Sequence, residues 1–150
     1  MIRIQREDFD VGAELAALTQ GNHRIGGLAV FVGLMREEAD GVAVRAMTLE
    51  HYPGMTEAKL AEIEAEARRR WTLEASLIVH RYGRLAPGDR IVLVATAAAH
   101  REAAFAACHF LIDWLKTKAP FWKQEETAAG PRWVAARGED DQAALHWLKE

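Results

Sequence analysis

The sequence predicts an α+β fold, in which helices pack on a mostly antiparallel sheet. Short apolar or alternating runs separated by turn residues indicate strands, and two long segments carry apolar residues at helical spacing. The connections mix hairpin-like turns with crossovers instead of repeating one strand–helix unit. The chain has 150 residues, of which 50% are hydrophobic and 27% are charged. This length and composition predict a single domain that spans residues 1–150.

The first fifty residues are expected to form three strands and one helix. Ile2 and Ile4 alternate with polar residues, which is typical of a strand. Asp10 is a suitable N-cap for a helix that ends near Gly21. The expected elements are a strand over 2–5, a helix over 11–18, a buried strand over 28–32, a loop over 33–36, a polar turn over 37–41 and a strand over 42–50.

The middle of the chain is expected to contain two long helices and a pair of strands. Thr56 follows the break at Pro53–Gly54 and is expected to cap the first helix. The second helix opens at His100 and ends before Pro120, which cannot continue it. Strands over 77–79 and 91–95 flank a turn at 86–89 and are expected to pair antiparallel. The expected apolar stripes are Leu60, Ile63, Ala67 and Trp71 on the first helix, and Phe105, Cys108, Ile112 and Leu115 on the second.

The last thirty residues predict a hairpin and a short helix. Residues 121–126 are expected to be extended, and the turn at 129–131 allows 132–134 to pair back. Asp140 or Asp141 is expected to cap the final helix.

Composition excludes several classes of protein. The formal net charge of -3 and the pI near 6.1 argue against a dedicated nucleic-acid binder. No apolar run approaches the roughly 20 residues of a membrane span, and the N-terminus lacks the apolar core of a signal peptide. Cys108 is the single cysteine and is expected to be buried, so a reducing compartment fits. These observations predict a cytoplasmic protein, and no metal-ligand spacing is found.

A cluster of lysines is the most informative feature for function. Lys116, Lys118 and Lys123 are interleaved with Pro120 and the bulky pair 121–122. A lysine held against apolar surface near other cations loses affinity for its proton, which suits an acid, base or nucleophile. The alternative is structural: Lys116 complements the negative end of its helix, and Lys123 extends past the tryptophan to water.

Other cations are placed where they can join this cluster. Lys116 and Lys123 lie on different sides of Pro120, so they can converge on one pocket from two elements. His100 and Arg101 open a helix, where free N–H groups and an arginine receive anions. Arg36 follows a buried strand in a loop, and Glu125 follows Lys123. The pattern predicts an anion-binding pocket with amine acid/base groups. Alternatively, His100 merely caps its helix, and Arg101 and Arg36 are solvent-exposed.

Five motifs, taken in this order, resemble the large, catalytic subunit of molybdopterin synthase over nearly the whole chain. Each motif is weak alone, and together they are specific. They are Phe31-Val32-Gly33-Leu34-Met35-Arg36, Leu49-Glu50-His51-Tyr52-Pro53-Gly54-Met55, His80-Arg81-Tyr82-Gly83-Arg84-Leu85 with Pro87-Gly88-Asp89, His100-Arg101-Glu102-Ala103-Ala104-Phe105, and Leu115-Lys116 with Trp122-Lys123-Gln124-Glu125.

The resemblance implies an α/β hammerhead fold and a homodimer. Each large subunit of the family binds a small ubiquitin-like subunit, which gives a heterotetramer. The C-terminal Gly-Gly tail of the small subunit ends in a thiocarboxylate and enters the pocket of the large subunit. Two sulfur atoms pass to cyclic pyranopterin monophosphate and form the dithiolene of molybdopterin. No metal, other cofactor or cysteine nucleophile is implied, nor is any nucleic acid or membrane partner.

The resemblance also assigns roles to residues. Lys116 matches the main acid/base group, and Lys123 matches its partner near the thiocarboxylate tail. The implied substrate contacts are Leu34, Met35, Arg36, His100, Arg101, Lys116, Lys123, Gln124 and Glu125. Lys118 stands where the family commonly has arginine and is left outside the site. Arg137 lies in a segment that is a candidate for reaching the pocket of the neighbouring subunit.

Two alternatives remain at this point. A non-catalytic binding or scaffold subunit would keep the fold and the partner surface, and loss of either key lysine would favour it. A lyase that forms a Schiff base through Lys116 would need a carbonyl substrate.

Overall fold

The computed structural model describes residues 1–134 and 138–148 of the chain. A first sheet has the strand order β1-β5-β7-β2, with β1 at Ile2–Gln5, β5 at Ala75–Arg81, β7 at Arg90–Ala98 and β2 at Gly27–Leu34. Its β1–β5 pair is parallel, and its other pairs are antiparallel.

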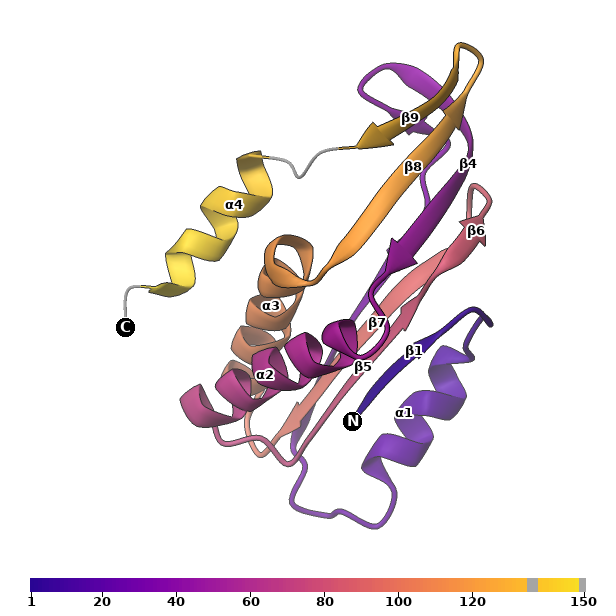
Figure 1. The fold of residues 1–150 in the computed structure, drawn as a ribbon. Helices are drawn as coiled ribbons and strands as arrows, with labels where there is room; N and C mark the ends of the chain where they lie inside the picture. The colour runs from indigo at the N-terminus through magenta and orange to yellow at the C-terminus, as the bar shows by residue number, and fades with distance from the viewer. Residues whose placement is uncertain (135–137, 149–150) are drawn as a thin grey trace.

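A second sheet extends beyond the first and forms the upper arm in Figure 1. Its order is β3-β4-β8-β9, and β6 pairs with β4. The strands are β3 at Glu38–Ala39, β4 at Val42–His51, β6 at Gly83–Leu85, β8 at Phe121–Thr127 and β9 at Gly130–Val134. All of its pairs are antiparallel, which confirms the predicted mostly antiparallel α+β arrangement and the hairpin near the C-terminus.

Helices cover both faces of the first sheet. The described helices are α1 at Val11–Thr19, α2 at Met55–Arg70, α3 at Arg101–Lys118 and α4 at Gly138–Leu145, followed by a 3-10 turn at His146–Leu148. Side chains alternate along β5, so Ile78 packs with α2 and α3 while Leu77 and Val79 pack with α1. No helix in the described ranges is long and apolar enough to cross a membrane.

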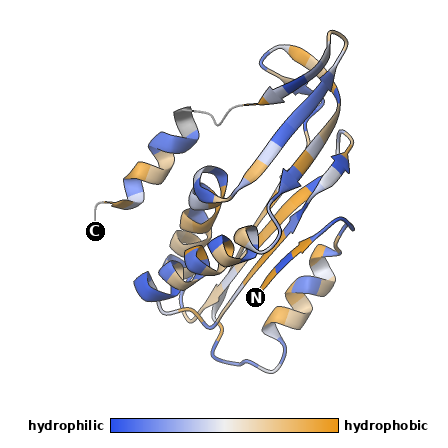
Figure 2. Ribbon diagram, viewed as in Figure 1, coloured by the Kyte–Doolittle hydropathy of each residue, from blue (hydrophilic) through white to orange (hydrophobic). Residues whose placement is uncertain are grey.

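The core lies mainly between the first sheet and the pair α2–α3. Leu60, Ile63, Phe110 and Leu111 are fully buried there, and each contributes roughly 1.5–3 kcal/mol by leaving water. Figure 2 shows hydrophobic residues along the strands of this sheet and hydrophilic residues at the end of α2. The predicted α2 stripe is confirmed for its three fully buried members, and Trp71, half-buried at the C-cap, packs edge-on against Phe110.

The predicted cap of α2 was wrong by two residues. The helix begins at Met55, and Gly54 occupies the N-cap position with φ of 86°, a conformation that favours glycine. The Gly54 N–H donates to Glu57 Oε2 over 3.0 Å. Thr56 is buried in the first turn instead, where its hydroxyl donates to the Tyr52 carbonyl over 2.8 Å.

The predicted stripe of α3 was wrong at Phe105, which is 66% exposed. The buried face is centred one residue earlier, on Ala104, Ala107, Cys108, Phe110, Leu111 and Leu115. The small Ala104 allows close packing on β7, where Thr96 Oγ1 donates to its carbonyl over 2.6 Å. Burial of Cys108 is confirmed, and desolvation raises the pKa of its thiol to about 11.

Several short features differ from the prediction. Gly33 and Leu34 belong to β2 rather than to a loop, and β3 and β6 are additional strands. Asp140 and Asp141 lie inside α4, which begins at Gly138.

Candidate active site

A cavity of about 380 Å³ lies where the two sheets meet the C-terminal end of α3. Its walls come from the end of β2, the β3 turn, the inner faces of β4 and β8, and the last turns of α3. Six of the residues predicted for the site line it: Leu34, Met35, Arg36, Lys116, Lys123 and Glu125. The cavity therefore gathers residues that are as many as 109 positions apart in the sequence, from Phe31 to Asp140.

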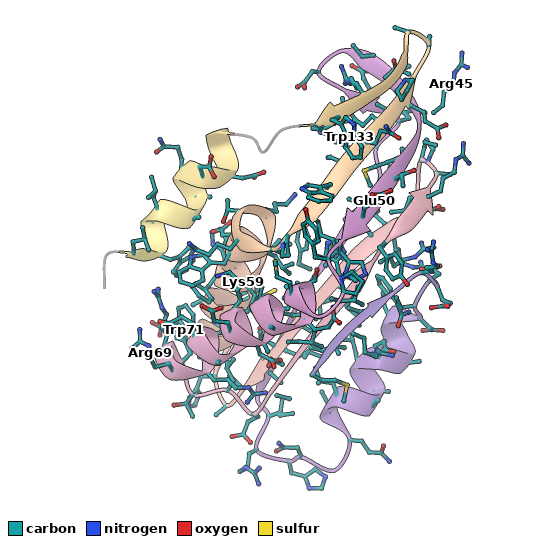
Figure 3. All side chains as sticks on the ribbon, in the orientation of Figure 1. Arg45, Glu50, Lys59, Arg69, Trp71 and Trp133 are labelled. Atoms are coloured by element: carbon teal, nitrogen blue, oxygen red, sulfur yellow. The ribbon has the colours of Figure 1, made fainter. Side chains whose placement is uncertain are left out.

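The register of β8 decides which of its side chains reach the cavity. Lys123 lies opposite Leu49 of β4, and Glu125 lies opposite Met47. Both pairs share the inner face because side chains alternate along a strand. Gln124 lies on the other face, beside Trp133 of β9, which is 62% exposed and labelled in Figure 3. The structure does not bring Gln124 to the cavity.

The end of α3 brings the two lysines together from different elements, as the sequence indicated. The helix ends at Lys118, and the chain turns at Pro120 into β8. Lys116 reaches the cavity from the helix and Lys123 reaches it from the strand. The Lys118 ammonium lies 4.8 Å from the centre of the Trp114 ring instead. Lys116 is exposed in this chain. The burial against apolar surface that the sequence predicted for its amine therefore requires a molecule bound in the cavity.

The end of β2 is held by backbone hydrogen bonds. The Met35 N–H donates to the Asp89 carbonyl over 2.9 Å, and the Gly88 N–H donates to the Met35 carbonyl over 2.8 Å. Met35 is buried, and its neighbours Leu34 and Arg36 are exposed. This clamp fixes the backbone that presents Arg36 to the cavity.

Glu125 is a buried carboxylate in the cavity wall. Arg132 donates to its Oε1 from Nη2 over 3.0 Å and from Nε over 3.2 Å. Arg132 also donates to the Ala39 carbonyl over 3.3 Å. The carboxylate is therefore neutralised by an arginine of β9, and the pair ties β8 and β9 to the β3 turn.

The remaining charged residues of the lining are equal in number for the two signs. Arg36, Lys116 and Lys123 face three acidic residues of the same cavity, which are Glu38, Asp40 and Asp140. A bound dianion would need more cations than this single chain places there. In the described ranges, no group of three or more His, Cys, Asp or Glu side chains is placed to hold a metal ion.

His80 also lines the cavity, although the sequence analysis assigned it no role in the site. Its ring stacks on Phe121 with 3.8 Å between centroids, and its Nδ1 lies 2.8 Å from the Arg81 carbonyl. Burial lowers the pKa of His80 to about 4, and the charges of His51 and Lys116 act in the same direction. The sequence does contain one indication of this position. His80 follows Ile78 by two residues, so both side chains lie on the face of β5 that meets α3.

His100 and Arg101 lie at the opposite end of α3 from the cavity. Fifteen residues separate Arg101 from Lys116 along the helix, about 22 Å at a rise of about 1.5 Å per residue. His100 occupies the N-cap position without a capping hydrogen bond from its side chain, and both side chains are exposed. A single chain therefore does not bring them to Lys116. Arg137 lies outside the described residues.

The chain is similar to proteins of one family. A family model described as MoaE protein matches residues 4–118. A molybdopterin synthase catalytic subunit of Ralstonia nicotianae is 55% identical over 146 residues, which cover 97% of this chain and 83% of that protein. Another, of Pseudomonas aeruginosa, is 56% identical and covers 97% of each. The solved structure of the molybdopterin biosynthesis MoaE protein of Burkholderia ambifaria matches with a TM-score of 0.86 at 57% identity, covering 100% of this chain and 99% of that one.

Proposed function

Because this chain belongs to the MoaE protein family, we infer that it acts as the catalytic subunit of a molybdopterin synthase and that its reaction takes place in the cavity described above. The resemblance seen in the sequence motifs is confirmed, and so is the α/β hammerhead-type fold that it implies. The observation that carries the assignment of the site is the convergence of Lys116 and Lys123 on one cavity from two elements.

The reaction is a sulfur transfer in molybdenum cofactor biosynthesis. A small ubiquitin-like subunit presents a C-terminal Gly-Gly thiocarboxylate, and two sulfur atoms pass in turn to cyclic pyranopterin monophosphate to give molybdopterin. The nucleophile is the thiocarboxylate sulfur, so this chain needs no thiol of its own. Cys108 suits that account because burial raises the pKa of its thiol and removes it from the chemistry.

The chain contributes cations and proton transfer. Lys116 is the main acid/base group, and Lys123 lies near the carboxyl end of the tail, where it stabilises the charge that develops there. Arg36 binds the substrate phosphate from the clamped end of β2. Filling the cavity with the tail and the pterin removes water around Lys116, which strengthens each of these interactions.

A homodimer completes the set of cations. In the described part of the chain, β2 is one of the two edge strands of the first sheet, and it runs from the N-terminal end of α3 to the cavity. Exposed apolar residues gather along it and on the neighbouring face of α3: Leu28, Val30, Phe31, Leu34 and Phe105. Two β2 edges pairing antiparallel about a twofold axis would bring His100 and Arg101 of one copy beside the cavity of the other. Those two residues then contact the phosphate and the pterin from a second copy.

The assembly is therefore a heterotetramer of two large and two small subunits. We also propose that residues 1–150 of each large subunit form one domain. We propose the cytoplasm as the location of the protein. Its single cysteine, Cys108, is a free thiol, which suits a reducing compartment.

The test of this function is product formation with a defined sulfur donor. The wild-type chain is incubated with cyclic pyranopterin monophosphate and a thiocarboxylated small subunit, and the product is identified by mass spectrometry. The expected product carries two sulfur atoms, and the matched small subunit with an ordinary carboxyl end gives none. Absence of any dithiolene product with a competent thiocarboxylated partner would favour a binding or scaffold subunit instead.

A further inference from the structure

We propose that His80 is a further positioning residue of the sulfur-transfer site, which offers the lone pair of its Nε2 atom to the ammonium group of Lys116. The proposal rests on the function proposed above. It concerns a side chain to which the resemblance gives no role.

The ring of His80 is fixed by its surroundings. Within β5, His80 lies between Ile4 of β1 and Val92 of β7, so its backbone is paired on both sides. Its side chain shares a face with Ile78, two residues earlier, which packs with α2 and α3. Phe121 stacks on the ring almost in parallel, at an interplanar angle of 15°. A ring held in this way has one orientation, and a fixed orientation is what a positioning residue needs.

The hydrogen bond at Nδ1 determines which nitrogen is left for the cavity. A carbonyl oxygen only accepts, so the contact of 2.8 Å with the Arg81 carbonyl places the hydrogen on Nδ1. In the neutral ring, Nε2 then carries a lone pair and accepts a hydrogen bond. Because burial lowers the pKa of His80 to about 4, the ring is neutral near pH 7 and keeps that lone pair.

Lys116 is the group that this lone pair can serve. Both residues line the same cavity, and the charge of Lys116 is one of the influences that lower the pKa of His80. Within residues 1–134 and 138–148, no hydrogen bond or ion pair holds the Lys116 ammonium group. The ring of His51, 6.1 Å from that of Phe121, is engaged elsewhere: its Nδ1 lies 3.1 Å from Thr56 Oγ1 and 3.9 Å from Glu57 Oε1.

A neutral acceptor suits an acid/base lysine better than a carboxylate would. A carboxylate beside the ammonium would favour the charged form strongly and hold the proton on the amine. Neutral imidazole directs the ammonium through a hydrogen bond and adds no negative charge, so Lys116 is oriented and still able to release its proton. Exclusion of water by the bound tail and substrate would strengthen this bond.

Two substitutions separate this role from a structural one. In His80→Asn, the side-chain amide can replace the Nδ1–H that bonds the Arg81 carbonyl, but no acceptor reaches the position of Nε2. In His80→Gln, the longer side chain can place its oxygen near the position of Nε2, but the bond to Arg81 is lost. His23→Asn, at an exposed position, is the control. The measurement is the single-turnover rate of molybdopterin formation at saturating substrate and thiocarboxylated small subunit, together with the KM for the pterin.

We expect His80→Asn to lower the rate about tenfold with little change in KM, because a loss of this size corresponds to one hydrogen bond to a charged group. His80→Gln should keep most of the wild-type rate even where its melting temperature falls. A wild-type rate in His80→Asn, or equal losses in the Asn and Gln variants, would overturn the proposal. No product from the wild-type chain would instead refute the proposed function itself.

If His80→Asn does not fold, a spectroscopic measurement tests the proposed contact between His80 Nε2 and Lys116. Long-range proton–nitrogen correlation spectra of the wild-type protein should show His80 with hydrogen on Nδ1. The Nε2 resonance should shift in Lys116→Ala and stay in place in Lys118→Ala. The opposite tautomer, or an Nε2 resonance that ignores Lys116, would contradict the proposed contact.

Discussion

Glu125 and His80 show how burial and partners set the behaviour of single residues in this cavity. The carboxylate of Glu125 is buried, and Arg132 donates two hydrogen bonds to its Oε1 atom. His80 is buried with a carbonyl as its partner, and a carbonyl oxygen does not offset the cost of burying a charged ring. Glu125 therefore has a cationic partner in the cavity wall, whereas His80 has none and is held neutral.

Removing Arg132 should destabilise the protein measurably. Arg132→Ala leaves a carboxylate that is only 6% exposed without its cation, and we expect a loss of about 1–3 kcal/mol in the free energy of unfolding. The matched control is Arg84→Ala, which removes the exposed pair between Arg84 of β6 and Glu126 of β8 and should cause no comparable loss. Urea denaturation at one fixed protein concentration measures both, and equal losses would show that the burial of Glu125 is not the cause.

His80 should make stability depend on pH in a defined window. Its pKa is about 4 in the folded chain against an ordinary value of 6.5, so the unfolded chain binds the extra proton between these values. Stability from this group is fully present above pH 6.5 and falls as the pH drops toward 4. We expect the wild type to lose about 2 kcal/mol between pH 7 and pH 5 through this group. Urea denaturation of His80→Gln should show a flatter profile over that window, and His23→Gln should follow the wild type; parallel profiles in all three would contradict the assignment.

At the scale of elements, long periodic segments were predictable and short or register-dependent features were not. The strands over 2–5 and 42–50, the strand pair across 86–89 and the C-terminal hairpin all follow from alternation and turn residues. The strands β3 and β6 are only 2 and 3 residues long, too short for a periodic signal. Their pairing depends on β4, which no local pattern reveals.

The same limit applies to faces of helices and strands. Apolar spacing on α3 fits a stripe through Phe105 as well as one through Ala104, and only the close approach of β7 selects the alanine. Gln124 adjoins two residues of the cavity in sequence, yet strand alternation turns it to the outer face. No neighbouring residue in the sequence indicates that His80 lines a cavity. That contact depends on how β8 and α3 pack against β5.

The exposed face of β2 and α3 should be needed for dimerisation. Phe105→Asp places a charge on this apolar face and is expected to shift the protein from dimer toward monomer without unfolding it. Met55→Asp is the control, because Met55 is 61% exposed at the start of α2, outside this face. Sedimentation velocity with circular dichroism reports both properties. A folded Phe105→Asp dimer as stable as that of Met55→Asp would remove this face from the interface.

At the scale of the whole molecule, the cavity is built at the junction of two sheets and one helix end. Each chain brings Arg36, Lys116 and Lys123 to that junction and leaves His100 and Arg101 at the far end of α3. Both groups were predicted from the sequence, which does not show that the length of α3 separates them. The proposed twofold assembly would bring the two groups together, because β2 runs from the N-terminal end of that helix to the cavity.

Mixed dimers test this arrangement directly. Arg101→Ala and Lys116→Ala homodimers should each be strongly impaired in molybdopterin formation. Co-expressed with different tags and purified as mixed dimers, the same two chains should regain activity, because one cavity then has its own Lys116 and the Arg101 of the other copy. If Arg101 served the cavity of its own chain, the mixed dimer would contain no intact site and would stay as inactive as its parents.

The most direct test of the central claim compares two neighbouring lysines in the sulfur-transfer reaction. Molybdopterin formation is measured with a thiocarboxylated small subunit for the wild type, Lys116→Ala and Lys118→Ala. Lys116 lines the cavity. Lys118 follows it by two positions in the sequence, but its ammonium group lies over the Trp114 ring. The account predicts a loss of about a hundredfold or more in Lys116→Ala and a wild-type rate in Lys118→Ala. A Lys116→Ala chain that forms molybdopterin at the wild-type rate would contradict the account and move the acid/base role away from this residue.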